Sequence, residues 1–207
     1  MNYNILITGA SGGIGAAIAQ KFAEDRHNLI LCYNKNELSA IETYRRCTEK
    51  GGHCLLKQCD LSCEDQVKAL IEEAETQLGP INIVINNAGI SHWGLLQDIS
   101  SEEWDKLFAV NVRSCFFTCK YTLPSMVRSG FGRIINISSM WGQVGASCEV
   151  AYSASKGAVI AMTKALAKET GPSGITVNCI APGVIDTPMN AAFSPEIIAE
   201  LQEETPM

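Results

Sequence analysis

The stretch that decides the fold lies near the amino terminus, where residues 5–15 read ILITGASGGIG. A run of apolar residues typical of a buried strand passes directly into a glycine-rich turn, and an amphipathic helical pattern follows. Glycines in such a turn allow the backbone to approach a pyrophosphate closely, and the start of the helix supplies oriented N–H donors. The order strand, turn and helix therefore predicts a dinucleotide-binding site rather than a purely structural turn.

Short apolar runs alternate with longer helical patterns along the rest of the chain. The run at 81–85, INIVI, has apolar residues on both faces, which suits a parallel sheet covered by helices on each side. We therefore expect one doubly wound α/β domain of the Rossmann type with a mostly parallel sheet, spanning residues 1–207. The predicted strands are 5–8, 29–33, 54–58, 81–86, 133–138 and 175–180, and the predicted helices are 14–25, 37–50, 64–78, 101–126 and 151–170.

Composition argues against several classes of protein. Of 207 residues, 46% are hydrophobic and 18% charged, which suits a compact domain, and the net charge of −6 offers no footprint for nucleic acid or an anionic membrane. Because the sequence shows neither a secretory signal nor a run long enough to span a membrane, we expect a cytoplasmic location. The nine cysteines lack the spacing of zinc or redox motifs, so we expect reduced thiols and no metal site.

Two side chains in residues 151–156, AYSASK, are the first candidates for chemistry. Tyr152 and Lys156 share one face of a helix, so a phenol and an ammonium group would lie side by side. A phenol has a reference pKa of about 10, and a cation within about 4–6 Å lowers that value by roughly one to three units. The pair is therefore a candidate proton-transfer device, and chance spacing on an amphipathic helix is the alternative.

These and other motifs together resemble the short-chain dehydrogenase/reductase family, and the resemblance covers essentially the whole chain. The family's glycine loop has the form TGxxxGxG, which Gly9, Gly13 and Gly15 match. The further motifs follow in the family's order: NNAG at 86–89, Asn111, Ser139, Tyr152 with Lys156, and Pro182-Gly183 after the sixth predicted strand.

The resemblance implies an oxidoreductase with four catalytic residues. Tyr152 would exchange a proton with the substrate oxygen while a hydride passes between nicotinamide and the substrate carbon. Lys156 would hold the nicotinamide ribose hydroxyls and lower the pKa of the tyrosine. Ser139 would hydrogen-bond the carbonyl oxygen and stabilise developing negative charge, and Asn111 would help anchor a water in a proton relay behind the lysine.

The expected cofactor is NADP, in its reduced form NADPH. Residues 32–35 read CYNK, so no carboxylate follows the second strand to bind a ribose 2′-hydroxyl and repel a 2′-phosphate, and Lys35 adds a cation. Many NADP-dependent relatives carry a basic residue where this chain has Gly12, which leaves NAD as the alternative. The implied cofactor contacts are Gly9, Ser11, Gly13, Ile14, Gly15, Tyr33, Asn34, Lys35, Asp60, Leu61, Asn87, Ala88, Gly89, Tyr152, Lys156, Pro182, Gly183, Ile185 and Thr187.

Within the family the sequence looks most like the 3-oxoacyl-carrier-protein reductases of fatty acid biosynthesis. Residues 138–150, SSMWGQVGASCEV, together with SHWG at 91–94, look like bacterial reductases that act on an aminopentanone modification of elongation factor P. In that case Trp141, Cys148 and Glu149 would line the substrate mouth beside Ser139 and Tyr152, and Glu149 would pair with the amine. The alternative is that Trp141 and Trp93 only pack the cleft wall. A dinucleotide-binding module without turnover is the remaining alternative.

The carboxyl-terminal region departs from the family pattern. Relatives continue beyond the position of Met207 with another helix and a seventh strand, so we expect a sheet that lacks both, with 175–180 at its edge. Because an open apolar edge favours aggregation, we expect either that the sequence is a fragment of a longer protein or that something else covers this edge. Residues 188–207 are expected to form a partial substrate lid. The helices that carry Asn111 and Tyr152 commonly form a dimer interface in the family, which implies a homodimer.

Overall fold

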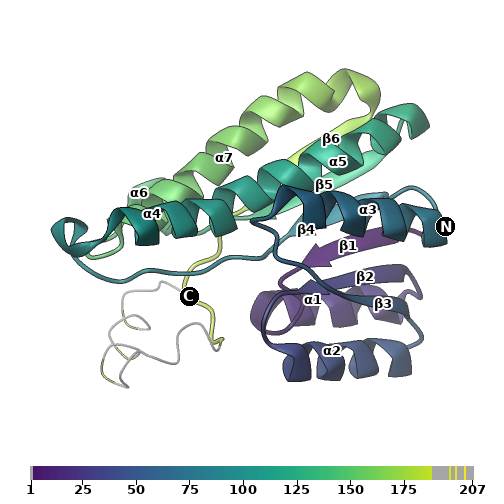
Figure 1. The fold of residues 1–207 in the computed structure, drawn as a ribbon, viewed down its shortest axis with the longest axis horizontal. Coiled ribbons are helices and arrows are strands. Elements are labelled where there is room, and N and C mark those ends of the chain that lie inside the picture. Colours follow the sequence, from purple (N-terminus) through teal and green to yellow (C-terminus); the bar gives the residue numbers. More distant parts are fainter. Residues whose placement is uncertain (1, 188–195, 197–198, 200–202, 204–207) are drawn as a thin grey trace.

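The computed structural model describes residues 2–187, 196, 199 and 203, and they contain a six-stranded parallel sheet in the order β3-β2-β1-β4-β5-β6 (Figure 1). The doubly wound α/β prediction is confirmed. The strand order reverses between β1 and β4, and ligands of such sheets bind in the crevice at the carboxyl ends of these strands. The strands are β1 (Asn4–Thr8), β2 (Asn28–Tyr33), β3 (His53–Gln58), β4 (Ile83–Asn86), β5 (Gly132–Ile137) and β6 (Ile175–Ile180).

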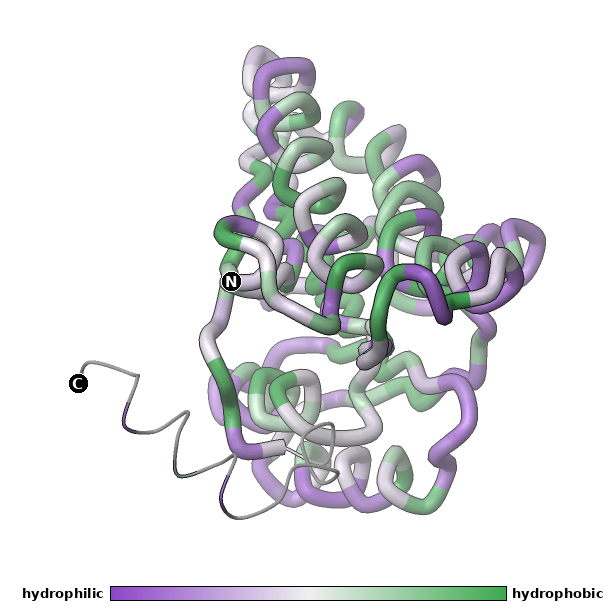
Figure 2. Tube along the Cα trace, turned by 90° about the vertical axis from the view of Figure 1, so that its left-hand side faces the viewer, coloured by the Kyte–Doolittle hydropathy of each residue, from purple (hydrophilic) through white to green (hydrophobic). Residues whose placement is uncertain are grey.

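Helices cover both faces of the sheet. On one face lie α1 (Gly13–Glu24) and α2 (Glu37–Glu49), and on the other lie α3 (Glu64–Leu78), α5 (Ser114–Ser129) and α7 (Val150–Thr170) (Figure 1). Because side chains alternate along a strand, Ile5 and Ile7 join the buried cluster under α1, whereas Leu6 joins the cluster under α3 and α5. Figure 2 shows hydrophobic and hydrophilic positions alternating along the helical turns, as expected for helices with one buried face.

The helical pattern expected over 101–126 is interrupted in the structure. α4 (Ser101–Phe108) starts with a capping box between Ser100 and Glu103, a π-helical segment η2 (Ala109–Arg113) follows, and α5 then continues to Ser129. Such π-bulges occur frequently at functional sites, and this one contains Asn111. The helix predicted over 101–126 is therefore confirmed, and the π-helical segment within it was not predicted.

Three short elements were not expected from the sequence. They are η1 (Leu96–Asp98), α6 (Trp141–Val144) and η3 (Gly171–Ser173). α6 is a single turn that ends at Gly145, where φ is +76°, so it is too short to leave a helical period in the sequence.

In the described part of the chain, β6 pairs with β5 and with no other strand, and Ile180 at its end is about half exposed. Most of the lid expected at 188–207 lies outside the described residues. No helix in that described part is long and apolar enough to cross a membrane. The same residues contain no group of three or more histidine, cysteine or acidic side chains placed to hold a metal ion.

Candidate active site

The glycine turn between β1 and α1 is packed too tightly for side chains at two of its positions. Gly9 has a φ of +65°, which favours glycine. A Cβ atom added to Gly15 would collide with the carbonyl oxygen of Gly9 and would lie 2.6 Å from Nδ2 of Asn87. Gly12 is different, because its added Cβ would meet no atom within 4 Å. Gly12 is also the N-cap residue of α1, and no side chain there accepts the N–H groups of the first helical turn. These N–H groups are therefore suited to bind an anion.

Thr8 and Asn87 tie this turn to the end of β4. The Thr8 hydroxyl accepts the N–H groups of Asn87 and Ala88 at 2.9 and 3.0 Å and donates to the Ile85 carbonyl at 3.2 Å. The Asn87 amide donates to the carbonyl oxygens of Thr8 and Gly9 at 3.1 and 3.2 Å. Thr8 thus positions the turn, although it was not among the predicted site residues. The sequence did indicate Thr8, because it is the first residue of the TGxxxGxG motif.

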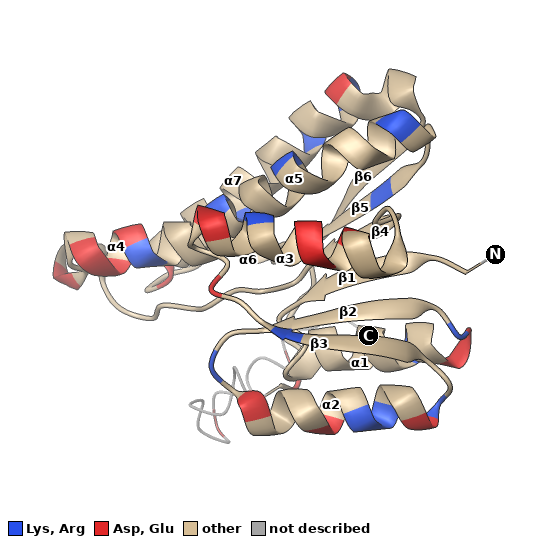
Figure 3. Cartoon of the chain, turned by 45° about the vertical axis from the view of Figure 1, so that its right-hand side comes forward, with Lys and Arg blue, Asp and Glu red and all other residues tan. Residues whose placement is uncertain are grey.

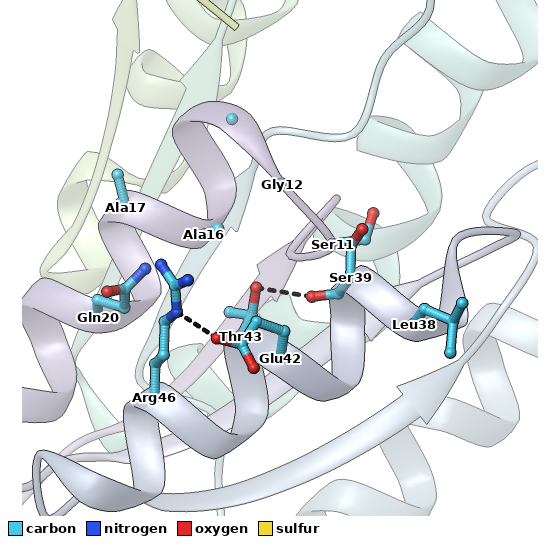
Figure 4. Close-up of a pocket in the computed structure, with 11 residues that line it drawn as sticks. Ser11, Gly12, Ala16, Ala17, Gln20, Leu38, Ser39, Glu42, Thr43 and Arg46 are labelled. Atoms are coloured by element: carbon cyan, nitrogen blue, oxygen red, sulfur yellow. Dashed lines mark hydrogen bonds and ion pairs between the residues drawn. The ribbon is translucent and has the colours of Figure 1, made fainter. Parts of the chain in front are cut away.

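A groove of about 510 Å³ adjoins the turn between α1 and α2 (Figure 4). Small residues, among them Gly12 and Ala16, form its α1 side, and Arg46 projects from α2. The Arg46 guanidinium is held by Glu42, with an Nε to Oε1 distance of 2.6 Å. The space beside the turn is therefore open, as a bound dinucleotide would require.

The predicted adenosine contacts lie at the ends of β2 and β3. Tyr33 is buried and its hydroxyl donates to Glu37 at 3.2 Å, whereas Asn34 and Lys35 are exposed. The Asp60 carboxylate accepts the backbone N–H and the hydroxyl of Ser62, at 3.0 and 2.7 Å, and the neighbouring Leu61 is buried. Lys35 is therefore an exposed cation after β2, in addition to Arg46 in the groove between α1 and α2.

The predicted contacts after β6 lie next to the turn as well. The Met140 N–H donates to the Pro182 carbonyl at 2.9 Å, and Met140 sulfur would lie 3.5 Å from a Cβ added to Gly183. A Cβ added to Gly13 would lie 3.3 Å from the methyl group of Thr187. Ile185 between them is 44% exposed. The chain thus crosses from the end of β5 to the glycine turn.

Ser139, Tyr152 and Lys156 are brought together at the carboxyl end of β5. Only 4% of Lys156 is exposed, and its Nζ donates to the Ile137 carbonyl at 2.9 Å and lies 5.7 Å from the centre of the Tyr152 ring. The Ser139 side chain lies close enough to the Tyr152 phenol to affect its pKa, and it accepts the N–H of Trp141 at 3.2 Å. A hydroxyl, a phenol and an ammonium group therefore converge on one spot.

The pKa of Tyr152 differs from the prediction. Burial raises it above its ordinary value, the hydrogen bond from Ser139 lowers it, and the charge of Glu149 raises it. Burial also lowers the pKa of Lys156. The lowering of the tyrosine pKa expected from the lysine was therefore wrong for this structure, because desolvation of the phenol is the largest effect.

Asn111 packs behind Lys156. Its side-chain oxygen accepts the Ile90 N–H at 2.8 Å, and its amide donates to the Ile90 carbonyl at 2.9 Å and to Ser155 at 3.0 Å. A Cβ added to Gly89 would lie 3.3 Å from both the Asn111 oxygen and Lys156 Nζ, so these three residues meet. The amide donors are already used, and the proposed role in a water relay stays a prediction.

A buried polar network supports the site and was missed in the sequence. Asn86 donates to Asn136 and accepts from Thr118, and Asn136 donates to Thr163, at 2.7 to 2.8 Å. These bonds fix the ends of β4 and β5 against α5 and α7. A polar residue at the end of an otherwise apolar strand was the only sequence signal.

The expected substrate mouth lies around the start of α7. Trp141 packs against the buried cluster of Leu107, Ala151 and Tyr152, whereas Trp93 is 72% exposed. Cys148 has a φ of +60°, and the half-buried Glu149 is the N-cap residue of α7. The role of Trp141 at the substrate mouth, and the alternative in which both tryptophans only pack the cleft wall, stay predictions.

The model of the family described as short chain dehydrogenase matches residues 3–197. The chain belongs to this short-chain dehydrogenase family. It is 40% identical to an uncharacterized oxidoreductase, YmfI, of Bacillus subtilis, over all of this chain and 85% of that protein. It is 36% identical to 3-oxoacyl-[acyl-carrier-protein] reductase FabG of Staphylococcus aureus, over all of this chain and 84% of that protein.

Solved structures of this family agree with the fold. A 3-oxoacyl-[acyl-carrier protein] reductase from Brucella melitensis superposes with a TM-score of 0.92 at 38% identity, over 99% of this chain and 78% of that one. A variant of actinorhodin polyketide ketoreductase with NADPH superposes with a TM-score of 0.90 at 32% identity and the same coverage. The short-chain dehydrogenase described here is therefore an oxidoreductase that acts on CH–OH or C=O groups.

Proposed function

We propose that this short-chain dehydrogenase is an NADPH-dependent carbonyl reductase that converts a carrier-protein-linked 3-oxoacyl group to the 3-hydroxyacyl product, a reaction of fatty acid biosynthesis. The convergence of Ser139, Tyr152 and the buried Lys156 at the carboxyl end of β5 carries the proposal. The FabG relative, whose name states that substrate, supports it at 36% identity.

NADPH, when bound, supplies a hydride to the carbonyl carbon of the substrate. The Ser139 hydroxyl donates a hydrogen bond to the carbonyl oxygen, and Tyr152 donates its phenolic proton to the same oxygen. The raised pKa of Tyr152 keeps the phenol protonated at neutral pH, as a general acid requires. Lys156 stabilises the phenolate left by proton transfer and holds the ribose hydroxyls. Asn111 keeps Ile90 and Ser155 in place behind the lysine.

The preference for NADPH rests on Lys35, and its replacement by serine tests that preference. An exposed cation beside a 2′-phosphate contributes about 1.4 kcal/mol, so kcat/KM for NADPH is expected to fall about tenfold. The value for NADH is expected to change less than about twofold, because NADH has no 2′-phosphate. Lys68→Ser on α3 is the matched control. Equal losses with both cofactors would contradict this assignment.

The function itself is tested by NADPH oxidation with an acetoacetyl thioester of a carrier protein. Oxidation that depends on the ketone is the expected result. If no ketone in a broad panel supports oxidation, while NADPH still binds, the alternative of a dinucleotide-binding module without turnover is favoured.

A second candidate substrate is the aminopentanone modification of elongation factor P, and Glu149 favours it. This carboxylate is half-buried, its pKa is raised by burial, and its charge reaches Tyr152. A buried carboxylate remains charged more readily when it pairs with a cation, and an amine on the substrate would supply one. Trp141 and Cys148 flank Glu149 at the mouth in this proposal. Reduction of modified elongation factor P, compared with the acetoacetyl thioester, separates the two candidates.

Glu149→Gln is expected to shift the pH profile of ketone reduction. Loss of this negative charge lowers the pKa of Tyr152, which must be protonated to donate. Activity is retained below the pKa of Tyr152 and lost above it. In a plot of kcat against pH, the fall in kcat at high pH, the high-pH limb, should therefore occur at a lower pH in this variant. Glu169→Gln at the far end of α7 is the control and should leave the limb in place. An unmoved or upward-shifted limb in Glu149→Gln would count against the coupling.

We also propose a homodimer through the helices that carry Asn111 and Tyr152. Phe116 and Val127 on α5 are each about half exposed, which supports an apolar contact on this side. Light scattering of the purified chain measures its mass in solution. Twice the mass of one chain supports the homodimer, and the mass of a single chain contradicts it.

A further inference from the structure

An exposed apolar surface lies around the substrate mouth, and we call it the mouth rim, defined as residues 91–105 and 144–150. Its apolar side chains are unusually open, with Val144 76% exposed and Trp93 72% exposed. The two segments of the rim are joined by a hydrogen bond of 2.7 Å from the Gly94 N–H to the Cys148 carbonyl. The further apolar members, Leu95, Leu96 and Val150, are between 42% and 56% exposed. Grouped apolar exposure of this kind marks an interaction site more often than scattered single residues do.

The mouth rim is continuous with the candidate active site. α4 packs through Leu107 against Ala151 and Tyr152, and Trp104 and Trp141 cover the same buried cluster. A molecule that reaches the Tyr152 phenol past this side therefore passes the rim. Cys148 within the rim has a φ of +60°, a strained conformation for a residue other than glycine.

The charges of the mouth rim have one predominant sign. Asp98 in η1 is exposed, as are Glu102, Glu103 and Asp105 in α4, where red acidic positions are visible in Figure 3. Glu149 lies in the other segment of the rim. Glu103 is accounted for by its capping box with Ser100. Asp98 and Asp105 have no such role, since one precedes α4 and the other lies beyond its first turn. Within the rim His92 is the sole basic side chain. Lys106 comes directly after the first rim segment, which ends at Asp105.

We infer that the mouth rim is a docking surface for a basic protein segment that carries the ketone. The inference rests on the proposed carbonyl reductase function in its second candidate form, a ketone on an amine-bearing protein, and specifies the charge of the segment that carries the ketone. Apolar atoms of the segment cover Trp93 and Val144, while lysine or arginine side chains face the acidic start of α4 and Glu149. Complementary charge of this kind accelerates association and selects among partners, and salt weakens it.

Synthetic carriers of opposite charge test the inference. An acetoacetyl group is attached to the amino terminus of a lysine-rich peptide and of a glutamate-rich peptide of equal length, and ethyl acetoacetate serves as the uncharged small ketone. For the unaltered chain we expect kcat/KM to be at least about tenfold higher with the lysine-rich carrier at low ionic strength. The ratio should approach one at about 0.5 M salt. Equal values at low salt, or preference for the glutamate-rich carrier, would overturn the inference.

Charge reversal within the rim provides the second arm. The double variant Asp98→Lys, Asp105→Lys is expected to lower the ratio between the two carriers at least about tenfold and to leave ethyl acetoacetate kinetics within about twofold. Glu72→Lys with Glu169→Lys makes the same change of net charge on α3 and at the far end of α7, and should keep the ratio. An unchanged ratio in the rim variant, or an equal change in the control, would contradict docking at the rim.

Binding without turnover separates the inference from the proposed function. Fluorescence anisotropy of the labelled lysine-rich peptide should show saturable binding to the unaltered chain that Trp93→Ala weakens about fivefold or more. Absence of ethyl acetoacetate reduction would refute the carbonyl reductase proposal, while this anisotropy result still decides whether the rim binds a basic segment. Binding that is absent, or unaffected by both Trp93→Ala and the rim charge reversal, would refute the docking surface.

Discussion

Tyr152→Phe is expected to lower kcat for ketone reduction by about 100- to 10,000-fold, the range that a positioned general acid contributes. The phenol is buried, lies near Ser139 and has the Lys156 ammonium 5.7 Å from its ring centre, so its hydroxyl is the proton donor that the site offers to a carbonyl oxygen. Phenylalanine keeps the ring and its packing against Leu107 and Ala151. NADPH affinity, measured by fluorescence titration, should therefore change less than about threefold.

Tyr121→Phe is the matched control for this substitution. The Tyr121 hydroxyl donates to Glu64 at 2.7 Å in a part-buried position between α5 and α3. Its removal should leave kcat within about twofold, because this bond does not involve Ser139, Tyr152 or Lys156. Near-normal turnover in Tyr152→Phe, or an equal loss in Tyr121→Phe, would remove the general acid from the account.

Gly15→Ala is expected to have the second large effect, on cofactor binding and on stability together. The added methyl group would collide with the Gly9 carbonyl and lie 2.6 Å from Asn87 Nδ2, so the turn must move. Overpacking of this kind costs about 1–3 kcal/mol. Since 1 kcal/mol shifts Tm by about 2–4 °C in a domain of this size, a fall of about 5 °C is expected. NADPH affinity should fall at least about tenfold, because the displaced backbone is the one that faces the phosphates.

Gly12→Ala in the same turn is the control. Its backbone is extended, with a φ of 170°, and its added methyl group meets no atom within 4 Å. Thermal unfolding should show a Tm within about 2 °C of the unaltered chain, and NADPH affinity should stay within about threefold. If Gly15→Ala behaves like Gly12→Ala, close packing at the turn does not shape the cofactor site.

The sheet could be predicted because its strands are short apolar runs separated by clear helical patterns, and each expected strand is found. The π-helical segment around Asn111 could not be predicted. Hydrophobic periodicity reports which face of a helix is buried, but the π-helical segment accompanies side-chain bonds from Asn111 to Ile90 and Ser155, which are distant in the sequence. The single turn at Trp141–Val144 was too short to produce a period.

The site was predictable where its chemistry depends on spacing, and not where it depends on burial. Motif order placed Ser139, Tyr152 and Lys156 in one site, and the structure brings them together. The direction of the Tyr152 pKa was missed because desolvation depends on packing by α4 and α6, which the sequence does not reveal. The supporting bonds of Thr8 and Asn136 were missed because their partners are distant in the sequence, Asn87 just after β4 and Thr163 on α7.

We propose that a ketone is reduced by a hydride from NADPH bound at the glycine turn, with Ser139, Tyr152 and Lys156 as the catalytic residues. The most direct measurement follows deuterium from NADPH labelled at the transferable position of its nicotinamide, with an acetoacetyl thioester as substrate and mass spectrometry of the product. We predict a 3-hydroxybutanoyl product that carries one deuterium on its hydroxyl-bearing carbon, formed by the unaltered chain and nearly absent with Tyr152→Phe. No product from the unaltered chain, or a product without deuterium at that carbon, would contradict the account.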